Sequence, residues 1–281
     1  MNDLCFLKKH FYLVSILILM LIFLMNCAHL FRSHNPVIQI KGSDTMRILA
    51  SRWAEEFMKS HPNVVIYTEA SGTAKGITSL IKGEIDISTA SRPIRSREAS
   101  ELAQKYGKLG INTLVAKDAL SIYLNPENPV NDLSLNDLKL IFTGKIRNWK
   151  EVGGSDENIT LFIRSPNSGT YLYFKEHVLD DESYYNKAIT LPTTRAIINE
   201  ISAQRNSIGY GGLAYGLNLK HCKIDGISPS YENVHNDSYP ITRYLYLYTV
   251  DKPQGHVKEF IDWVLNEGQK IVDDVGFIPI W

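Results

Sequence analysis

The stretch RSPNSGTYLYFKEHVLD, residues 164 to 180, places an arginine four residues before a Ser-Gly-Thr sequence. The preceding residues, ITLFIR, have the composition of a buried strand, and the residues after Ser168 have that of a helix. The first backbone N–H groups of a helix lack partners within the helix, and the helix dipole adds partial positive charge there. This stretch therefore predicts a strand, a loop and a helix start that together can bind an anion.

Two other predicted strand-to-helix junctions have the same chemistry. Ser43 and Thr45 stand in KGSDTMRIL, and Ser71, Gly72 and Thr73 stand in EASGTAKGI. Serine and threonine are also ordinary helix N-caps, so any single junction can be explained without a ligand. Three similar junctions favour one shared site, because such loops lie at the carboxyl ends of the strands in an open α/β sheet, where ligands usually bind.

Two arginines fit this interpretation. Arg92 follows Ser91 in STASRPI, just after a predicted strand, and another arginine ends ITLFIR. A guanidinium presents a planar fork of donors that suits a tetrahedral oxyanion. We therefore predict that one half of an anion site is formed by four residues of the opening stretch: Arg164, Ser168, Gly169 and Thr170.

The rest of the chain reads as alternating strands and helices, which indicates an α/β protein with mostly parallel sheets. In the first part we expect strands at 37–42, 64–70, 85–91, 111–116 and 119–125, and helices at 45–61, 74–84 and 96–107. A segment rich in Pro and Asn, residues 125–132, then interrupts the pattern. In the second part we expect helices at 134–144, 170–180 and 194–204, strands at 159–164 and 207–213, a long aromatic strand within 237–251, and a closing helix at 257–276.

The composition is that of an ordinary globular protein. The chain has 281 residues, of which 44% are hydrophobic and 21% charged, with zero formal net charge. It is long enough for two lobes with separate cores, and nothing in the overall charge indicates nucleic-acid binding. Cys222 is the one cysteine beyond the N-terminal segment, so no disulfide is expected. The eight histidines of the chain form no HxxxH or HExxH pair, so we expect no metal and no cofactor.

Residues 1–27 have the layout of an export signal. Lys8 and Lys9 precede an uncharged apolar run of about 15 residues, which is shorter than the roughly 20 that a membrane-spanning helix needs. The end of the run, LMNC, resembles a bacterial lipobox with Cys27 as the lipidated residue, although Asn26 replaces the usual Gly, Ala or Ser. Residues 28–36 would be a tether. An uncleaved anchor or plain secretion are the alternatives, and each places the folded part outside the cytoplasmic membrane.

Seven elements, in this order, resemble the PstS-like phosphate-binding proteins of bacterial phosphate ABC transporters. They extend from about residue 38 to the C-terminus: GSDT, EASGTAKGI, STASRPI, LKLIFTGKIRNWKEVGG, RSPNSGT, SIGYGGLAY and YPITRYLYLYT. The resemblance implies a two-lobed periplasmic-binding-protein (type II) clamshell, each lobe a mixed, mostly parallel sheet flanked by helices. Lobe I would comprise residues 37–125 and 240–281, and lobe II residues 126–239.

The resemblance also implies the function. The protein would be a monomeric extracytoplasmic lipoprotein, not an enzyme, that captures inorganic phosphate between the lobes and delivers it to an ABC permease and its ATPase. The implied phosphate ligands are Ser43, Thr45, Ser71, Gly72, Arg164, Ser168, Gly169 and Thr170. We also predict Ser91 and Arg92 as ligands, with Arg92 as a second cationic one.

The position of Arg92 departs from the family pattern. Many members have an aspartate there, which accepts the proton of hydrogen phosphate, whereas an arginine accepts no hydrogen bond. Selectivity for phosphate then needs another acceptor, and Asp44, Glu69 and Asp86 are candidates by position. The same feature keeps open a receptor for another oxyanion, such as sulfate, molybdate, arsenate or a phosphonate.

Two further alternatives differ in function. A sensor or adhesin would use the same cleft chemistry to signal. A hydrolase would use Ser71 or Ser168 as nucleophile and would need an adjacent base. Lys75 stands four residues after Ser71, not three as in SxxK enzymes, and the chain has no GxSxG sequence. Enzyme activity is therefore not expected.

Overall fold

The computed structural model describes residue 20 and residues 35–281. The chain divides into two units, residues 1–36 and 37–281. The predicted signal, the lipobox at Cys27 and most of the predicted tether lie outside the described residues. Within the described part of the chain, we find no helix with the length and apolar character needed to cross a bilayer.

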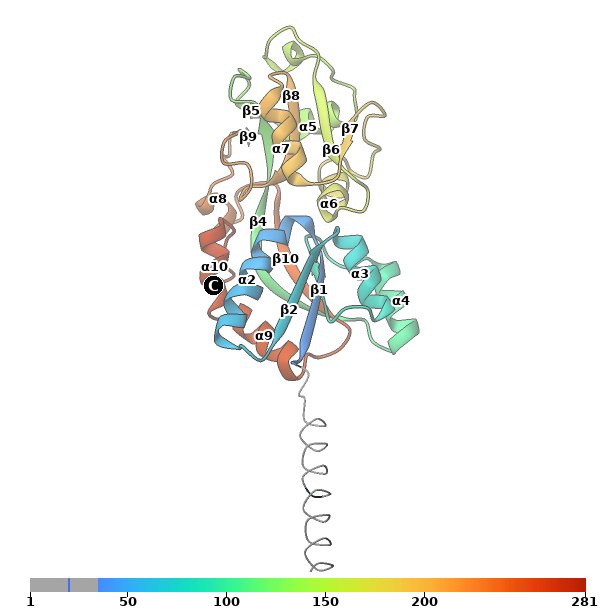
Figure 1. Cartoon of the computed structure of the whole chain (residues 1–281). Helices are drawn as coiled ribbons and strands as arrows, with labels where there is room; N and C mark the ends of the chain where they lie inside the picture. The colour runs from blue at the N-terminus through green and yellow to red at the C-terminus, as the bar shows by residue number, and fades with distance from the viewer. Residues whose placement is uncertain (1–19, 21–34) are drawn as a thin grey trace, which may run out of the picture. The chain divides into compact units, whose positions relative to one another are not determined.

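One half of the unit 37–281 is built from the N-terminal and C-terminal parts of the chain. It is a mixed sheet with helices on its two sides (Figure 1). Its strands, in spatial order, are β2 (Val65–Ala70), β1 (Val37–Gly42), β3 (Ile87–Ala90), β10 (Thr242–Thr249) and β4 (Ile111–Leu124). Strands β1, β2 and β3 are parallel, and β10 is antiparallel to both β3 and β4. The flanking elements are η1 (Asp44–Met46), α2 (Arg47–Ser60), α3 (Thr73–Lys82), α4 (Ser96–Tyr106), α9 (Gly255–Leu265) and α10 (Gly268–Val275).

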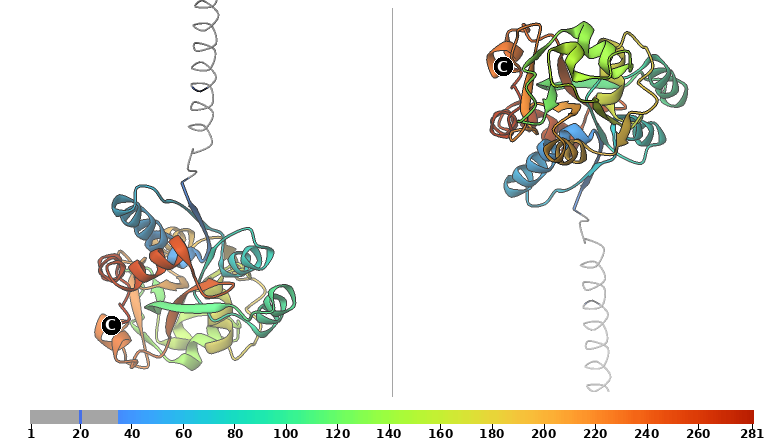
Figure 2. Two further views of the ribbon diagram at one scale, coloured as in Figure 1. Left: turned by 90° about the horizontal axis from the view of Figure 1, so that it is seen from below. Right: turned by 90° about the horizontal axis from the view of Figure 1, so that it is seen from above.

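Helices α2 and α10 pack together on one side of this sheet and α3 and α4 on the other (Figure 2). The sequence explains α2, because Leu49, Trp53 and Phe57 recur at helical spacing and are buried. These side chains form a hydrophobic core with Phe260 of α9 and with the sheet.

The second half is another mixed sheet. Strand β6 (Thr160–Arg164) is parallel to β7 (Ile189–Leu191) and β8 (Ser207–Gly212), and β8 is antiparallel to the end of β4. Strand β9 (Lys220–Ile224) pairs with β4 and with the short β5 (Asp132–Leu133). The helices are α5 (Leu135–Phe142), η2 (Trp149–Val152), α6 (Gly169–His177), α7 (Thr194–Ala203) and α8 (Tyr231–His235). A second core gathers around Phe142, Trp149 and Phe174.

Strands β4 and β10 connect the two cores. Val115, Ala116 and Leu245 belong to the first core, whereas Ala119, Leu120 and Ile241 belong to the second. Both strands therefore pass from one core to the other over residues 117–118 and 242–244. The expected α/β fold with mixed sheets and two lobes is confirmed. The lobe boundaries at residues 125 and 240 stay a prediction.

The structure differs from the expected elements in three ways. Strand β4 runs unbroken through Lys117 and Asp118, where two strands were expected, because Asp118 lies opposite Arg243 of β10 and the two charges pair. The closing helix is split into α9 and α10 before Gly268, whose carbonyl accepts a hydrogen bond from Trp53 Nε1 at 2.8 Å. The short strands β5, β7 and β9 were not predicted, since they have few residues to show a period. Cys222 lies buried in β9 as a free thiol, and burial raises its pKa to about 12.

Candidate functional site

The predicted binding loops meet in the structure. Because β1, β2 and β3 are parallel, the loops that follow them leave from the same edge of the sheet. The loop after β6 reaches these loops from the other half of the molecule. The backbone N–H of Ala74 donates to the carbonyl of Asn167 at 3.2 Å, and Asn167 Nδ2 donates to the carbonyl of Ser71 at 3.3 Å.

Two glycines make this close approach possible. A Cβ on Gly169 would collide with Thr73 Oγ1 and would lie 2.5 Å from Ser91 Oγ. A Cβ on Gly72, which has φ of 98°, would lie 2.9 Å from the carbonyl oxygen of Asn167. The start of α6 therefore packs directly against the start of α3 and the end of β3.

A second contact joins Thr45 of η1 to Thr170 of α6, whose hydroxyl oxygens are 3.0 Å apart. Arg243 of β10 donates from Nη1 to Thr170 Oγ1 at 2.9 Å and from Nη2 to Thr45 Oγ1 at 3.4 Å. Asp118 of β4 accepts from Arg243 Nε and Nη2 at 2.9 and 2.7 Å. Burial raises the pKa of Asp118, and the neighbouring guanidinium opposes this shift. All four side chains are buried.

Arg164 also lies where the halves meet. Its Nη1 donates to Thr194 Oγ1 at 2.8 Å and lies 3.2 Å from Asp44 Oδ2, and its Nη2 donates to the carbonyl of Pro192 at 3.0 Å. Asp44 Oδ2 also accepts from the backbone N–H of Thr194 at 3.0 Å. Burial lowers the pKa of Arg164 and the charge of Asp44 opposes this, but an arginine remains a cation at neutral pH.

Three donors on the converging loops have no protein partner. Within the described residues, Ser71 Oγ, Arg92 Nε and Arg164 Nε are buried and make no hydrogen bond. Leaving a buried donor unpaired costs about 1–3 kcal/mol, and more for a charged group. Ser168 Oγ accepts from the backbone N–H groups of Thr170 and Tyr171, so its proton stays available to donate. The side chain of Ser43 makes no capping bond to η1. This donor excess fits an anion.

Arg92 is paired with a carboxylate of its own half. Its Nη1 and Nη2 donate to the two carboxylate oxygens of Glu98 at 2.8 and 2.6 Å, whereas its Nε is buried without a partner. Its predicted role as a second cationic ligand stays a prediction. Nη1 of Arg92 also donates to the carbonyl of Pro93. Because Glu98 accepts from the backbone N–H of Arg95 as well, Arg92 holds the loop after β3 against the start of α4. Its neighbour Ser91 does lie at the convergence and donates from its backbone N–H to Thr73 Oγ1 at 3.2 Å.

The structure separates the three candidate acceptors. Glu69 has a side chain that is 62% exposed and pairs with Lys41. Asp86 accepts from the backbone N–H of Gln39 in an exposed position. Asp44 is buried beside Arg164, so it is the one of the three whose carboxylate is buried next to a proposed ligand.

Sequence reasoning missed Arg243, Asp118 and Thr194. A signal for Arg243 was present in TRYLYLYT, because strand alternation places it on the same face as Leu245 and Leu247, which are buried. A charged residue on a buried strand face needs a partner. No comparable sequence signal marks Asp118 or Thr194.

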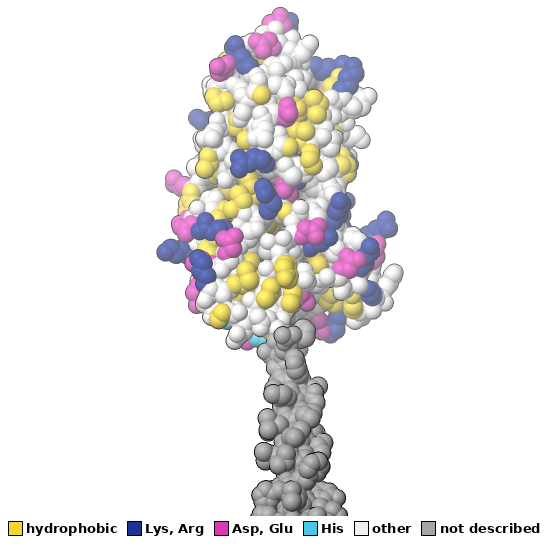
Figure 3. All heavy atoms as spheres, viewed as in Figure 1, with side chains coloured by type: hydrophobic (Ala, Val, Ile, Leu, Met, Phe, Trp, Pro, Cys, Tyr) yellow, Lys and Arg dark blue, Asp and Glu magenta, His cyan; other side chains and the backbone are white. Residues whose placement is uncertain are grey.

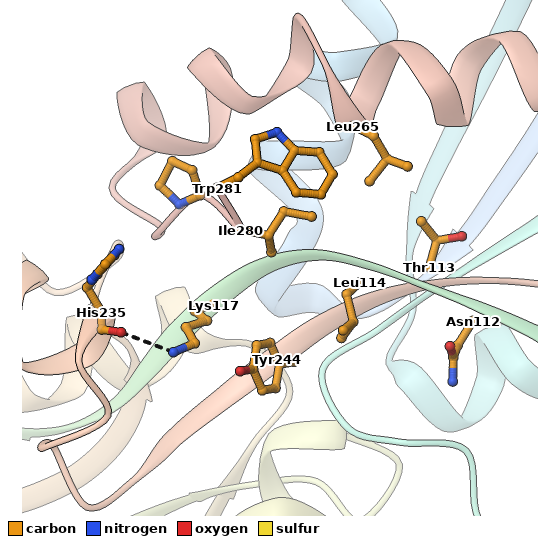
Figure 4. A pocket seen from close by; sticks show the side chains of 10 residues that line it. Asn112, Thr113, Leu114, Lys117, His235, Tyr244, Leu265, Ile280 and Trp281 are labelled. Carbon is orange, nitrogen blue, oxygen red and sulfur yellow. Dashed lines mark hydrogen bonds between the residues drawn. The ribbon is translucent and has the colours of Figure 1, made fainter.

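A hollow of about 630 Å³ lies elsewhere, beside the C-terminal residues (Figure 4). Leu114, Tyr244, Ile280 and Trp281 give it an apolar lining. Its cation, Lys117, already donates to the carbonyl of His235 and to Asp237 Oδ1. This hollow is therefore not suited to an oxyanion.

Comparison with known proteins identifies the family. Residues 32–267 match the model of the PBP superfamily domain. The phosphate-binding protein PstS of Bacillus subtilis is 33% identical over 247 residues, which cover 86% of this chain and 80% of that protein. PstS of Pseudomonas aeruginosa is 29% identical over 263 residues, covering 85% and 81%.

Solved structures of phosphate-binding proteins are similar to this chain as well. A putative phosphate ABC transporter substrate-binding protein from Clostridium perfringens, with bound phosphate, has a TM-score of 0.81 and 30% identity, covering 87% of this chain and all of that one. An ABC-type phosphate transport receptor from Vibrio cholerae has a TM-score of 0.72 and 25% identity, covering 86% and 99%. The chain therefore belongs to the PBP superfamily and, within it, to the PstS-like phosphate-binding proteins.

Proposed function

We propose that this protein captures inorganic phosphate between its lobes and delivers it to an ABC permease and its ATPase. The observation that carries the proposal is the pair of unpartnered buried donors, Ser71 Oγ and Arg164 Nε, on loops that meet from the two halves of the molecule. The relatives named above are phosphate-binding proteins, and the Clostridium perfringens structure holds phosphate. The family is one of transport receptors, so the expectation that the protein is not an enzyme is confirmed.

The proposed ligands come from both halves, and Arg92 contributes through its unpaired Nε. Hydrogen bonds to a charged group contribute about 1.5–3 kcal/mol each when water is excluded. Several such bonds support micromolar or tighter affinity after the cost of closing the lobes is subtracted. The proposed ligands are Ser43, Thr45, Ser71, Gly72, Ser91, Arg92, Arg164, Ser168, Gly169 and Thr170.

The location follows from the family and from the N-terminal sequence. We propose that the folded part works outside the cytoplasmic membrane as a monomer, anchored through lipid on Cys27. We also propose residues 37–125 with 240–281 as lobe I and residues 126–239 as lobe II. The viewed surface shows Lys and Arg interspersed with Asp and Glu (Figure 3), which suits a small ligand better than nucleic acid.

Calorimetric titration with phosphate, sulfate and molybdate tests the proposed function. The expected result is one phosphate per chain with micromolar or tighter affinity, and at least about tenfold weaker binding of sulfate. The protein is first unfolded and refolded to remove any anion carried through purification. Preference for sulfate or molybdate would favour the receptor for another oxyanion.

Replacing Asp44 with asparagine is expected to reduce the selectivity for phosphate over sulfate by at least about tenfold. We propose that Asp44 accepts the proton of hydrogen phosphate, because it is buried beside Arg164 and only accepts hydrogen bonds when ionised. An asparagine of similar size also donates, so it tolerates an anion that has no proton.

The measured quantity is the ratio of the two dissociation constants. Loss of the charge that faces Arg164 would change both affinities alike and leave this ratio unchanged. An unchanged ratio would therefore show that Asp44 positions Arg164 but does not accept the phosphate proton. Glu69→Gln, at an exposed position where the carboxylate pairs with Lys41, is the control and should leave the ratio of the two constants unchanged.

A further inference from the structure

Arg243 and Asp118 face each other at the point where β10 and β4 pass between the two cores. The side chains are 0% and 1% exposed. Asp118 fixes the guanidinium by accepting from both Nε and Nη2. Gly212 of β8 packs closely against this carboxylate, since a Cβ on Gly212 would lie 2.9 Å from Asp118 Oδ1, and within the described residues that oxygen accepts no hydrogen bond. The guanidinium therefore has little freedom to turn.

The remaining donors of Arg243 reach one hydroxyl from each half of the molecule. Nη1 donates to Thr170 Oγ1 and Nη2 to Thr45 Oγ1. Thr170 lies in the first turn of α6 beside the second core, and Thr45 lies in η1 beside the first. Arg243 can donate to both hydroxyls at once only while η1 and the start of α6 lie close together.

The bonds also set the direction of the two hydroxyl groups. An arginine donates and never accepts, so each hydroxyl must use a lone pair toward Arg243. The contact of 3.0 Å between Thr45 Oγ1 and Thr170 Oγ1 uses one of the two hydroxyl protons. The other proton is left over and needs an acceptor. The pair of threonines thus becomes a donor to an oxyanion.

We propose that Arg243, held by Asp118, is a positioning residue for phosphate: it turns the hydroxyls of Thr45 and Thr170 into donors and joins the two loops in the closed form. This inference rests on the proposed function. Arg243 acts through the threonines and is not itself a ligand of the anion.

A double-mutant cycle separates this role from direct contact. Phosphate dissociation constants are measured for the full chain, Arg243→Lys, Thr170→Val and the double variant. Each single change is expected to weaken binding at least about tenfold, because lysine keeps the charge but cannot hold Asp118 and two hydroxyls at once. The double variant should bind about as well as the weaker single variant, since both changes remove the same donor.

Ser71→Ala provides the matched control, because Ser71 Oγ has no contact with Arg243. The factors by which Ser71→Ala and Arg243→Lys raise the phosphate dissociation constant should multiply in the double variant. If the factors for Arg243→Lys and Thr170→Val also multiplied in their double variant, the proposal would be overturned. That result would indicate that Arg243 contacts the anion or only supports the fold.

Thermal unfolding checks that each variant is folded. If Arg243→Lys does not fold, Asp118→Asn replaces it in the cycle, since it keeps the guanidinium but weakens the group that orients it. Non-additivity with Thr170→Val is again expected, and multiplying effects again reject the proposal. Absence of phosphate binding by the unaltered protein would instead reject the proposed function, so the two failures are distinguishable.

Discussion

Arg164→Ala is expected to weaken phosphate binding at least about tenfold, because it removes a charged donor whose Nε has no protein partner. The change also breaks a buried ion pair with Asp44, and losing one member of such a pair typically costs about 3–5 kcal/mol of stability. The variant should therefore unfold at a lower temperature, and calorimetry must be done well below that temperature.

The control for this prediction is Arg97→Ala. Arg97 lies on α4 with a side chain that is 90% exposed, and it pairs with Glu101. A surface pair of this kind contributes little, so both affinity and melting temperature should stay near their original values. If folded Arg164→Ala bound phosphate as tightly as the unaltered protein, Arg164 would not be a ligand.

Gly169→Ala is expected to weaken phosphate binding at least about tenfold by keeping the two loops apart. The added methyl group would overlap Thr73 Oγ1 and Ser91 Oγ, and relieving such overlap costs about 1–3 kcal/mol. Since these atoms belong to the other half of the molecule, the open form avoids the clash and the closed form does not. Small-angle X-ray scattering with and without phosphate should show a smaller compaction than for the unaltered protein.

Gly255→Ala is the control for the glycine prediction. Its added methyl group would meet nothing within 4 Å, although its φ of 53° makes the change mildly strained. It should lose some stability and retain phosphate affinity. Full compaction and unchanged affinity in Gly169→Ala would mean that the loops do not need this close approach.

Much of the fold follows from local sequence patterns. Buried residues at helical spacing marked α2, and hydroxyl-rich junctions marked the loops after β1, β2 and β6. These signals are visible because they lie within a few consecutive residues. Where the closing helix is split, the carbonyl of Gly268 accepts a hydrogen bond from Trp53, 215 residues away, and no local pattern contains that contact.

The site was predictable in part for the same reason. Arg164 and Ser168 stand in one short stretch of sequence. The hydrogen bond from Arg243 to Thr170, in contrast, joins β10 to α6 across 73 positions. The ion pair of Arg92 with Glu98 was not predicted, because the position of Arg92 after a strand suggested a ligand, while Glu98 lies six residues later on α4. A charged side chain at a strand end predicts that some group will pair with it, but the local sequence does not show whether that group is a ligand or another side chain.

The place of β10 in the first sheet bears on how the chain folds. It lies between β3 and β4, yet it follows them in sequence by more than a hundred residues. The first sheet cannot be assembled until this late segment has arrived, whereas the strands β5 to β9 are contiguous and can collapse together earlier. Long-range pairing of this kind slows folding and leaves β3 and β4 with unpaired edges in the meantime. A chain that is exported before it folds would thus expose these edges on the far side of the membrane.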